Sequence, residues 1–269
     1  DTDAVYWATI FLDCVAQEFI DKAKDIPGLE KAVAFTEKGR ALGLGQCGLH
    51  TYLQSKWIPF ESLEARYKSD EIAERIAIAS WTASSAMGAV LGQPEWLEDT
   101  LDGKRNTHLI AIAPTKSTAL IMGGISEGIN PDPKVVFNQN TSAGEVERIT
   151  PIFLQLMKDK GVYTKKNIKS IEDAFGSCQH VDWLTEHEKA VFKTAFEMDM
   201  HAINRMASSR QRYVDQGQSL NHFFGSDATE EYISSVYKEV LLDKNILSSY
   251  YAYSSADVAG SDGECVSCQ

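Results

Sequence analysis

Apolar side chains recur at helical spacing in three segments near the start of the chain, residues 3–25, 39–54 and 69–91. Such a repeat places apolar residues on one face of a helix, so we predict a helix in each segment. The second segment begins with several glycines, and Ser69 has the side chain of an N-cap for the third. The apolar face of the first helix is predicted to comprise Val5, Ile10, Phe11, Cys14, Val15 and Phe19.

The pattern changes after residue 107. The run HLIAIAP at 108–114 is short and apolar and ends in proline, which predicts a buried strand. Residues 115–133 have the composition of a turn, a short helix and a loop. We predict a further helix over 148–160 and a short strand near 246–252. Helices separated by short apolar strands are typical of an α/β protein.

Two further helices carry capping signals at their starts. Thr185 and Glu188 have the spacing of a capping box before a helix predicted over 185–200. Asp227 and Glu230 have the same spacing before a helix predicted over 228–242. Most of this last helix's apolar stripe is expected to lie in the core. The stripe comprises Ile233, Val236, Tyr237, Val240 and Leu241.

Composition narrows the possible functions. The chain has 269 residues, of which 43% are hydrophobic, enough for one large domain or two small ones. Its net charge of -12 argues against binding to a nucleic-acid backbone, which needs clustered basic residues. We find no apolar run of membrane-helix length and no cleavable leader. The five cysteines, an odd number in a chain of this size, favour a reducing cytoplasm over a disulfide scaffold.

The segment Pro114–Thr118 is a candidate anion-binding site. It joins the predicted strand to a predicted helix start, where Thr115, Ser117 and Thr118 supply hydroxyls and free backbone N–H groups. Lys116 can add positive charge. An ordinary cluster of helix-capping residues explains the same pattern, because Ser and Thr are common caps.

The C-terminal segment carries two pairs of candidate redox residues. Cys265 and Cys268 form a Cys-x-x-Cys within the last residues, in a stretch of about 16 residues with little to bury. A metal site would need two more ligands, so an exchanging dithiol is the better interpretation. Tyr250 and Tyr251 are a redox pair or simple packing residues. On a strand, adjacent side chains would point to opposite faces.

The remaining cysteines and histidines give weaker signals. Cys14, Cys47 and Cys178 are isolated from one another, and we predict that all three are buried structural thiols. A metal site at Cys178 and His180 would have only two ligands and is disfavoured. His201 and His222 are expected to be packing or surface residues. No metal site is therefore predicted in this chain.

Four motifs, in order along the chain, resemble one family. They are GRALGLGQCGLHTYL at 39–53, RNTHLIAIAPTKSTALIMGGISEGINP at 105–131, RQRYVDQGQSLNHFF at 210–224, and SSYYAYSS followed by the terminal Cys-x-x-Cys. Together they resemble the C-terminal part of the large, catalytic subunit of class I ribonucleotide reductase. The chain departs from the usual family pattern at Asn130, where Glu is usual before proline, at Ala119 and at Gly217.

The resemblance implies a fold and site residues. Residues 1–253 are expected to form the C-terminal portion of the reductase's ten-stranded α/β barrel, helix-rich, with 254–269 as a disordered redox tail. Pro114–Thr118 would bind the diphosphate of a ribonucleoside diphosphate. Tyr250 and Tyr251 would be the last carriers of a radical. Cys265 and Cys268 would reduce the active-site disulfide left by each turnover.

The resemblance also implies partners. A small subunit with a di-metal tyrosyl radical would supply the radical, and thioredoxin or glutaredoxin would re-reduce the tail. No cofactor is expected on this chain itself. In the family, the radical cysteine, the disulfide pair, a catalytic Asn and Glu and the nucleotide-binding regulatory regions lie N-terminal to the segment matched here. A start at Asp1, not methionine, fits a processed product, a split-gene product or a fragment of something longer. Because half a barrel would leave open strand edges, we expect a separately encoded N-terminal part of the subunit, as from a split gene.

Other interpretations remain open at this point. A split gene of this kind suits a phage or another genome rich in mobile elements. If it is phage-encoded, the chain would act in the cytoplasm of a bacterial host. The alternative is a non-catalytic reductase fragment that acts as an interaction or decoy protein. A stand-alone thiol–disulfide protein is disfavoured, because its Cys-x-x-Cys would be expected at a helix start. Neither nucleic acid nor a membrane is expected as a partner.

Overall fold

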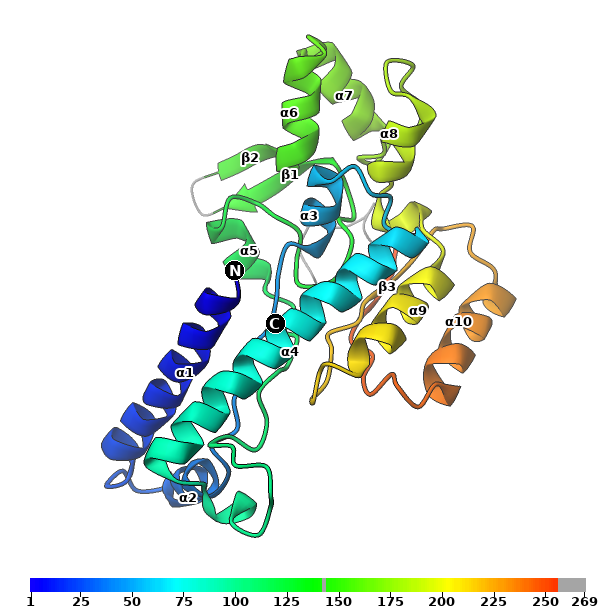
Figure 1. The fold of residues 1–269 in the computed structure, drawn as a ribbon. Coiled ribbons are helices and arrows are strands. Elements are labelled where there is room, and N and C mark those ends of the chain that lie inside the picture. Colours follow the sequence, from blue (N-terminus) through cyan, green and yellow to red (C-terminus); the bar gives the residue numbers. More distant parts are fainter. Residues whose placement is uncertain (142–143, 256–269) are drawn as a thin grey trace. The chain divides into compact units, whose positions relative to one another are not determined.

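The structure is a computed structural model that describes residues 1–141 and 144–255 (Figure 1). The chain divides into two compact units, and helices α4 (Leu63–Leu91) and α9 (Met200–Gln211) contribute residues to both. Within the described residues, no helix combines the length and apolarity needed to cross a lipid bilayer. The first unit comprises Asp1–Gly45, Ser69–Ile112 and Arg210–Gln218, and the second comprises Gln46–Lys68, Ala113–Ser209 and Ser219–Gln269.

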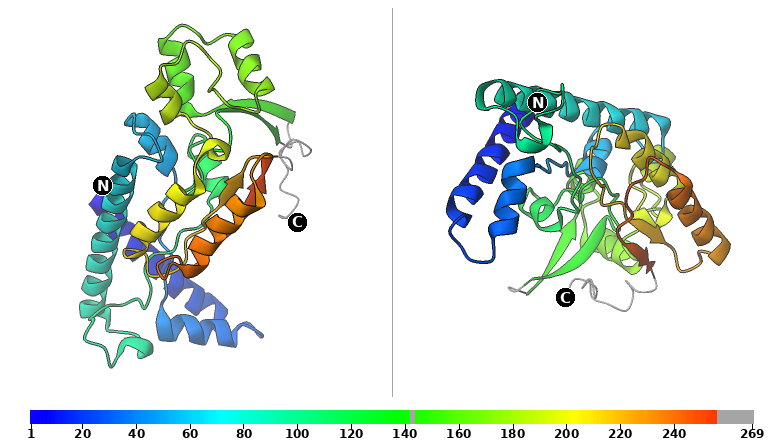
Figure 2. Two further views of the ribbon diagram at one scale, coloured as in Figure 1. Left: turned by 90° about the vertical axis from the view of Figure 1, so that its right-hand side faces the viewer. Right: turned by 90° about the horizontal axis from the view of Figure 1, so that it is seen from below.

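The first unit begins with a pair of packed helices, α1 (Thr2–Ala23) and α2 (Glu30–Gly39), which lie side by side in Figure 2. The helix predicted over 3–25 is confirmed as α1. The Asp1 carboxylate caps it by accepting a hydrogen bond from the Asp3 N–H at 3.0 Å. A capped helix start of this kind satisfies one of the N–H groups that lack an intrahelical acceptor.

The predicted apolar face of α1 is not the face that the first unit buries. Thr9 and Asp13 are buried instead, together with a small apolar cluster that includes Val33 of α2. Cys14 is exposed, which makes the prediction of a buried thiol there wrong. The sequence pattern did not reveal α2, because Val33 is its only large buried apolar residue. The exposed apolar side chains of α1 are Trp7, Phe11, Val15 and Phe19.

A buried polar network explains the orientation of α1. The Arg40 guanidinium donates to the Asp13 carboxylate from Nε at 2.8 Å and from Nη2 at 2.9 Å, and both side chains are 4% exposed. The Asn106 side chain donates to Asp13 Oδ1 at 2.8 Å and accepts from the Ser84 hydroxyl of α4 at 2.8 Å. A buried carboxylate needs such partners, so this polar face must be covered.

The strand predicted over 108–114 is only partly confirmed, because these residues form isolated bridges and no continuous strand, and His108 and Ala113 are exposed. Parallel bridges join Leu44 to Ile110 and Ile112 to Gln218. Leu109, Ile110 and Ile112 are each buried, as predicted. The predicted N-cap of the long helix is wrong: α4 begins at Leu63, and Ser69 lies inside it, where its hydroxyl accepts from buried Arg210 at 2.6 Å. The 3-10 helix η1 (Glu95–Leu97) packs against α2.

The second unit contains a hairpin and three helices around one apolar cluster (Figure 1). The helix predicted over 148–160 is shorter, because β2 extends to Ile149 and Pro151 occupies the first turn of α6. β1 and β2 are antiparallel, and their register pairs Val136 with Ile149. The elements are β1 (Val136–Thr141), β2 (Gly144–Ile149), α6 (Pro151–Asp159), α7 (Lys165–Asp173) and α8 (Glu186–Val191).

The single helix predicted over 185–200 is interrupted. The capping box of Thr185 and Glu188 is confirmed at the start of α8, where the Thr185 N–H donates to the Glu188 carboxylate at 2.7 Å. A second capping box, formed by Thr194 and Glu197, starts the 3-10 helix η2 (Ala195–Glu197). Capping side chains compete with a continuous helix, so the second box separates α8 from α9.

The last helix, α10 (Glu230–Leu242), confirms the predicted segment but not its cap. Thr229 is the N-cap, and its hydroxyl accepts from the Tyr232 N–H at 3.2 Å, so the capping role predicted for Asp227 is wrong. α10 lies beside α9 in Figure 1. β3 (His222–Phe224) pairs in parallel with β4 (Ala252–Ser254), which lies slightly beyond the predicted strand. The two remaining helices are α3 (Leu49–Ser55) and α5 (Lys116–Ile121).

Candidate functional site

A hydrogen bond fixes Thr115, near the start of the candidate anion-binding segment. Thr115 adopts a left-handed backbone conformation with φ of 60°, and its hydroxyl accepts a hydrogen bond from the Gly128 N–H at 2.9 Å. Gly128 has φ of 52°, and a Cβ there would lie 2.9 Å from the Ala113 carbonyl oxygen. Only glycine allows this close approach. The Thr115 hydroxyl is therefore held by the loop that follows α5.

The other polar residues of this segment face solvent. Lys116, Ser117 and Thr118 are exposed in the first turn of α5, where backbone N–H groups have no intrahelical acceptor. The half-buried Glu127 carboxyl lies close enough to interact with the Lys116 amine. Burial raises the pKa of Glu127, and the nearby Lys116 charge opposes that change. The segment thus offers accessible hydroxyl and amide donors beside one lysine.

The two tyrosines lie against each other. The ring centroids of Tyr250 and Tyr251 are 4.0 Å apart, with an interplanar angle of 52°. The expectation that adjacent tyrosines point to opposite faces is wrong, because both residues precede β4 and escape the alternation of a strand. The Tyr250 N–H donates to the Leu220 carbonyl at 2.8 Å, and the Tyr251 carbonyl accepts from the His222 N–H at 2.9 Å. The pair is therefore fixed to the segment that leads into β3.

Behind this strand pair lies a buried histidine. The fully buried His222 ring bonds through Nε2 to Asn204 Oδ1 at 2.8 Å. Since the Asn204 amide donates to the Glu239 carboxylate at 3.0 Å, its oxygen must accept, and His222 carries its proton on Nε2. Burial lowers the pKa of His222 to about 4. His201 is the last member of this hydrogen-bond network. Its Nδ1 lies 2.6 Å from the Glu239 carboxylate, and its side chain is partly exposed.

The cysteines differ in environment. Cys178 is buried, as predicted, and burial raises the pKa of its thiol to about 12. Cys47 is only half-buried. Cys265 and Cys268 lie outside the residues that the structure describes, so their prediction has no structural test. In residues 1–141 and 144–255, no group of three or more His, Cys, Asp or Glu side chains is arranged to hold a metal.

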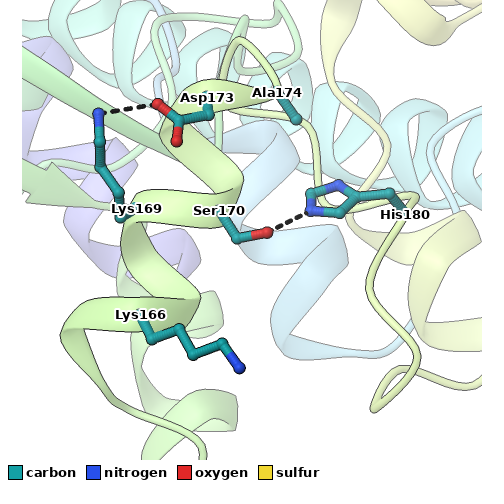
Figure 3. Close-up of a pocket in the computed structure, with 6 residues that line it drawn as sticks. All are labelled: Lys166, Lys169, Ser170, Asp173, Ala174 and His180. Atoms are coloured by element: carbon teal, nitrogen blue, oxygen red, sulfur yellow. Dashed lines mark hydrogen bonds and ion pairs between the residues drawn. The ribbon is translucent and has the colours of Figure 1, made fainter.

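A shallow depression on the second unit involves none of the predicted site residues. Figure 3 shows it between α7 and His180. The His180 ring lies 2.8 Å from the Ser170 hydroxyl, and the Lys169 amine forms an ion pair with Asp173 at 2.8 Å. Both members of this ion pair are exposed, so the depression has the character of ordinary solvated surface. Lys166 and Ala174 complete the lining.

Comparison with known proteins decides the family. The family described as ribonucleotide reductase, barrel domain, matches residues 2–101 and 95–241 of the chain. The chain belongs to this family. The predicted fold class is also confirmed: the solved alpha subunit of the class Id ribonucleotide reductase of Actinobacillus ureae superposes with a TM-score of 0.85 at 37% identity. That match covers 94% of the chain and 46% of the solved subunit.

Curated relatives give the same family and show the extent of the match. A Frog virus 3 protein that carries the name of a ribonucleoside-diphosphate reductase large subunit is 36% identical over 239 residues, which is 88% of the chain and 42% of that protein. The large subunit of Invertebrate iridescent virus 3 is 32% identical over 86% of the chain and 37% of its own length. The chain therefore spans less than half the length of these relatives.

The buried His222 gives a prediction about acid stability. Its pKa is about 4 when folded and near 6.5 ordinarily, so between these values the unfolded chain binds the proton more strongly. Stability should thus fall as the pH is lowered from 6.5 to 4, by up to about 3 kcal/mol. His222→Gln keeps an N–H donor for Asn204 and should lose this pH dependence. Denaturant unfolding at several pH values measures it.

The exposed His187 provides the matched control. His187→Gln should retain the acid sensitivity of the unaltered chain. Equal pH dependence in the unaltered chain and in His222→Gln would show that this histidine does not carry the effect.

Proposed function

We propose that this chain is the C-terminal part of a ribonucleoside-diphosphate reductase catalytic subunit and acts in the reduction of ribonucleotides to deoxyribonucleotides. One observation in particular supports this: in a member of the barrel-domain family, the rings of Tyr250 and Tyr251 lie 4.0 Å apart, and both residues are hydrogen-bonded to the backbone at Leu220 and His222. Simple packing would not require that a phenol such as Tyr250 stay 47% exposed. Close, accessible phenols suit proton-coupled radical transfer.

In this proposal, Pro114–Thr118 binds the substrate's diphosphate. The hydrogen bond from the Gly128 N–H to the Thr115 hydroxyl fixes the start of the segment. The exposed hydroxyls of Ser117 and Thr118 remain available as donors. Hydrogen bonds to a charged acceptor are stronger than those to a neutral one. Lys116 adds a positive charge beside the diphosphate.

Cys265 and Cys268 are proposed to restore the active site after each turnover. Reduction of one ribonucleotide leaves the active site as a disulfide. The two tail thiols would reduce that disulfide by exchange, giving up two electrons and two protons and becoming a disulfide themselves. Thioredoxin or glutaredoxin would then reduce the tail. The tail must therefore reach both the active-site disulfide and the external reductant.

The proposal requires further parts of a reductase. A small subunit with a di-metal tyrosyl radical would deliver the radical to Tyr250 and Tyr251. An N-terminal part of the large subunit would supply the radical cysteine and complete the barrel, as the product of a split gene or as the preceding part of one chain. This assembly would act in the cytoplasm and serve deoxyribonucleotide supply for DNA replication, with ATP-binding regulation in its N-terminal part.

The first prediction from this proposal concerns turnover in a complete reductase that contains this chain. Replacing Tyr251 by Phe removes the ionisable phenol and should abolish multiple and single turnovers alike. The double change Cys265→Ser and Cys268→Ser should instead leave about one turnover per chain, because the first active-site dithiol needs no tail. Deoxyribonucleotide formed per chain, measured with thioredoxin present, separates the two defects.

Tyr163→Phe, at an exposed tyrosine of the second unit, is a suitable control, since it makes the same chemical change and leaves both proposed tyrosines in place. If the complete mixture is active with Tyr251→Phe, the radical role is wrong. If the mixture is inactive with the unaltered chain, although every component is folded, a non-catalytic fragment or decoy becomes the better interpretation.

The second prediction concerns substrate affinity. Ser117→Ala combined with Thr118→Val removes two hydroxyl donors from the proposed diphosphate site. We expect KM for the ribonucleoside diphosphate to rise at least about tenfold, because a hydrogen bond to a charged group contributes about 1.5–3 kcal/mol. Steady-state kinetics measure it, with Thr82→Val on the exposed face of α4 as the control. An unchanged KM would remove these residues from the site.

The third prediction concerns docking of the small subunit's C-terminal tail, for which the resemblance to the family implies an apolar groove near α10 that includes Ile233 or Val240. Val240 is 7% exposed and Val236 fully buried, so an Asp at either position would disturb the fold. Leu241 is 83% exposed and Leu242 70% exposed, which makes them the accessible part of α10. Leu241→Asp should weaken small-subunit binding at least about tenfold, by loss of a buried leucine contact.

Titration calorimetry or a pull-down of known stoichiometry measures that affinity. Leu63→Asp, at another exposed leucine of the second unit, is the matched control. Equal affinities for the unaltered chain and Leu241→Asp would exclude this end of α10 from the docking surface.

A further inference from the structure

A single side-chain amide joins the loop after α5 to the segment before β3. Asn130 Nδ2 donates to the Ser219 carbonyl at 3.0 Å, and Asn130 Oδ1 accepts from the Asn221 N–H at 3.0 Å. Asn130 is only 3% exposed. The amide therefore bonds to the backbone of residues 219–221 with one donor and one acceptor, much as a neighbouring strand would.

Asn221 extends the same arrangement to the tyrosine pair. Its side-chain oxygen accepts from the Tyr251 N–H at 3.2 Å, and the adjacent Leu220 carbonyl accepts from the Tyr250 N–H at 2.8 Å. Asn221 is 4% exposed. The backbone N–H groups of the two tyrosines are thus bonded to Leu220 and Asn221. Both of these residues lie within 219–221, the segment to which Asn130 is hydrogen-bonded.

In the other direction, hydrogen bonds connect Asn130 to the proposed diphosphate site. The Thr115 hydroxyl accepts from the Gly128 N–H at 2.9 Å, and the Asn130 N–H donates to the Glu127 carbonyl at 3.0 Å. Gly128 and Asn130 are separated by one residue. A short series of hydrogen bonds and covalent links therefore runs from Thr115 through Asn130 and Asn221 to Tyr251, all within the second unit.

We propose that Asn130 is a positioning residue that sets the tyrosine pair relative to the diphosphate-binding segment. This inference rests on the proposed function. The residue acts through the backbone it binds and touches neither substrate nor radical. The physical reason is the steep dependence of reaction rates on geometry, since a misplacement of about 1 Å can slow an enzyme about 100-fold.

The chemistry of the contact explains why the residue is an amide. The Ser219 carbonyl can only accept a hydrogen bond and the Asn221 N–H can only donate one, so the side chain between them must do both. A carboxylate only accepts, and at this place it would set a negative charge against the Ser219 oxygen. The Glu that is usual in the family at position 130 could not make the same pair of bonds while ionised.

The test compares Asn130→Asp with Asn167→Asp. Both changes replace an amide whose nitrogen donates to a backbone carbonyl, that of Ser219 at 3.0 Å or that of Val162 at 2.7 Å. Asn167 lies on α7 and is not a member of the proposed series of hydrogen bonds. A general loss of stability should affect both variants, whereas a loss of positioning should affect Asn130→Asp alone.

In the complete reductase, kcat of Asn130→Asp should fall about 10- to 100-fold while KM for the ribonucleoside diphosphate stays within about twofold. Lowering the pH should restore part of kcat, because a protonated carboxyl can again donate to the Ser219 carbonyl. In the full chain, hydrogen exchange of the Tyr251 amide should be at least about tenfold faster than in Asn167→Asp. Asn221→Ala should show the same kinetic pattern. If Asn130→Asp does not fold, Asn221→Ala takes its place in the test.

The outcomes are distinguishable. Equal kcat and equal Tyr251 exchange in Asn130→Asp and Asn167→Asp, with an active unaltered enzyme, would overturn the positioning role. A parallel change of KM and kcat in both variants would do the same, since it indicates lost stability alone. An inactive unaltered enzyme would contradict the proposed function instead, and the hydrogen-exchange comparison would still test whether Asn130 holds the tyrosine segment.

Discussion

Buried backbone groups must be hydrogen-bonded, and in this protein side chains meet much of that demand. The extended segments of the first unit share only isolated bridges, so their remaining N–H and C=O groups need other partners. The Asp215 carboxylate accepts from the N–H groups of Leu109 and Ile110 at 2.8 and 2.9 Å. The Gln216 amide donates to the carbonyls of Leu42 and Ile110. The neighbouring side chains of Asp215 and Gln216 thus join extended segments that isolated β-bridges alone would join weakly.

The second unit solves the same problem at the candidate site. Asn130 binds the backbone on either side of Leu220, and Asn221 binds that of Tyr251. Thr51 and Ser126 each accept, through their hydroxyls, a hydrogen bond from the other's N–H. Amides and hydroxyls both donate and accept, which lets them stand in for a strand. The tyrosine pair is therefore held by backbone hydrogen bonds to Leu220 and His222 together with one side-chain bond to Asn221.

Buried charge follows the same principle. Arg210 is 1% exposed, and burial lowers its pKa to about 10. It donates to the Ser69 hydroxyl and to Gln218 in the first unit. Asp13 and Arg40 form a buried ion pair. Such groups must be enclosed with their partners, because an unpaired buried charge destabilises a protein strongly. This requirement explains why α1 turns Asp13 inward and leaves Phe11 and Val15 exposed.

Local sequence determined the features whose cause is local. The helical periodicity of α1, the capping box of Thr185 and Glu188, and the burial of Leu109, Ile110 and Ile112 were all predictable, because each depends on residues a few positions apart. The four motifs were enough to indicate the family. The buried face of α1, the inward role of Ser69 and the close contact of Tyr250 with Tyr251 depend on partners such as Arg40, Arg210 and Leu220, which are distant in sequence. Only the tertiary structure brings those partners together, and a pattern read along one chain carries no signal for contacts between residues that far apart.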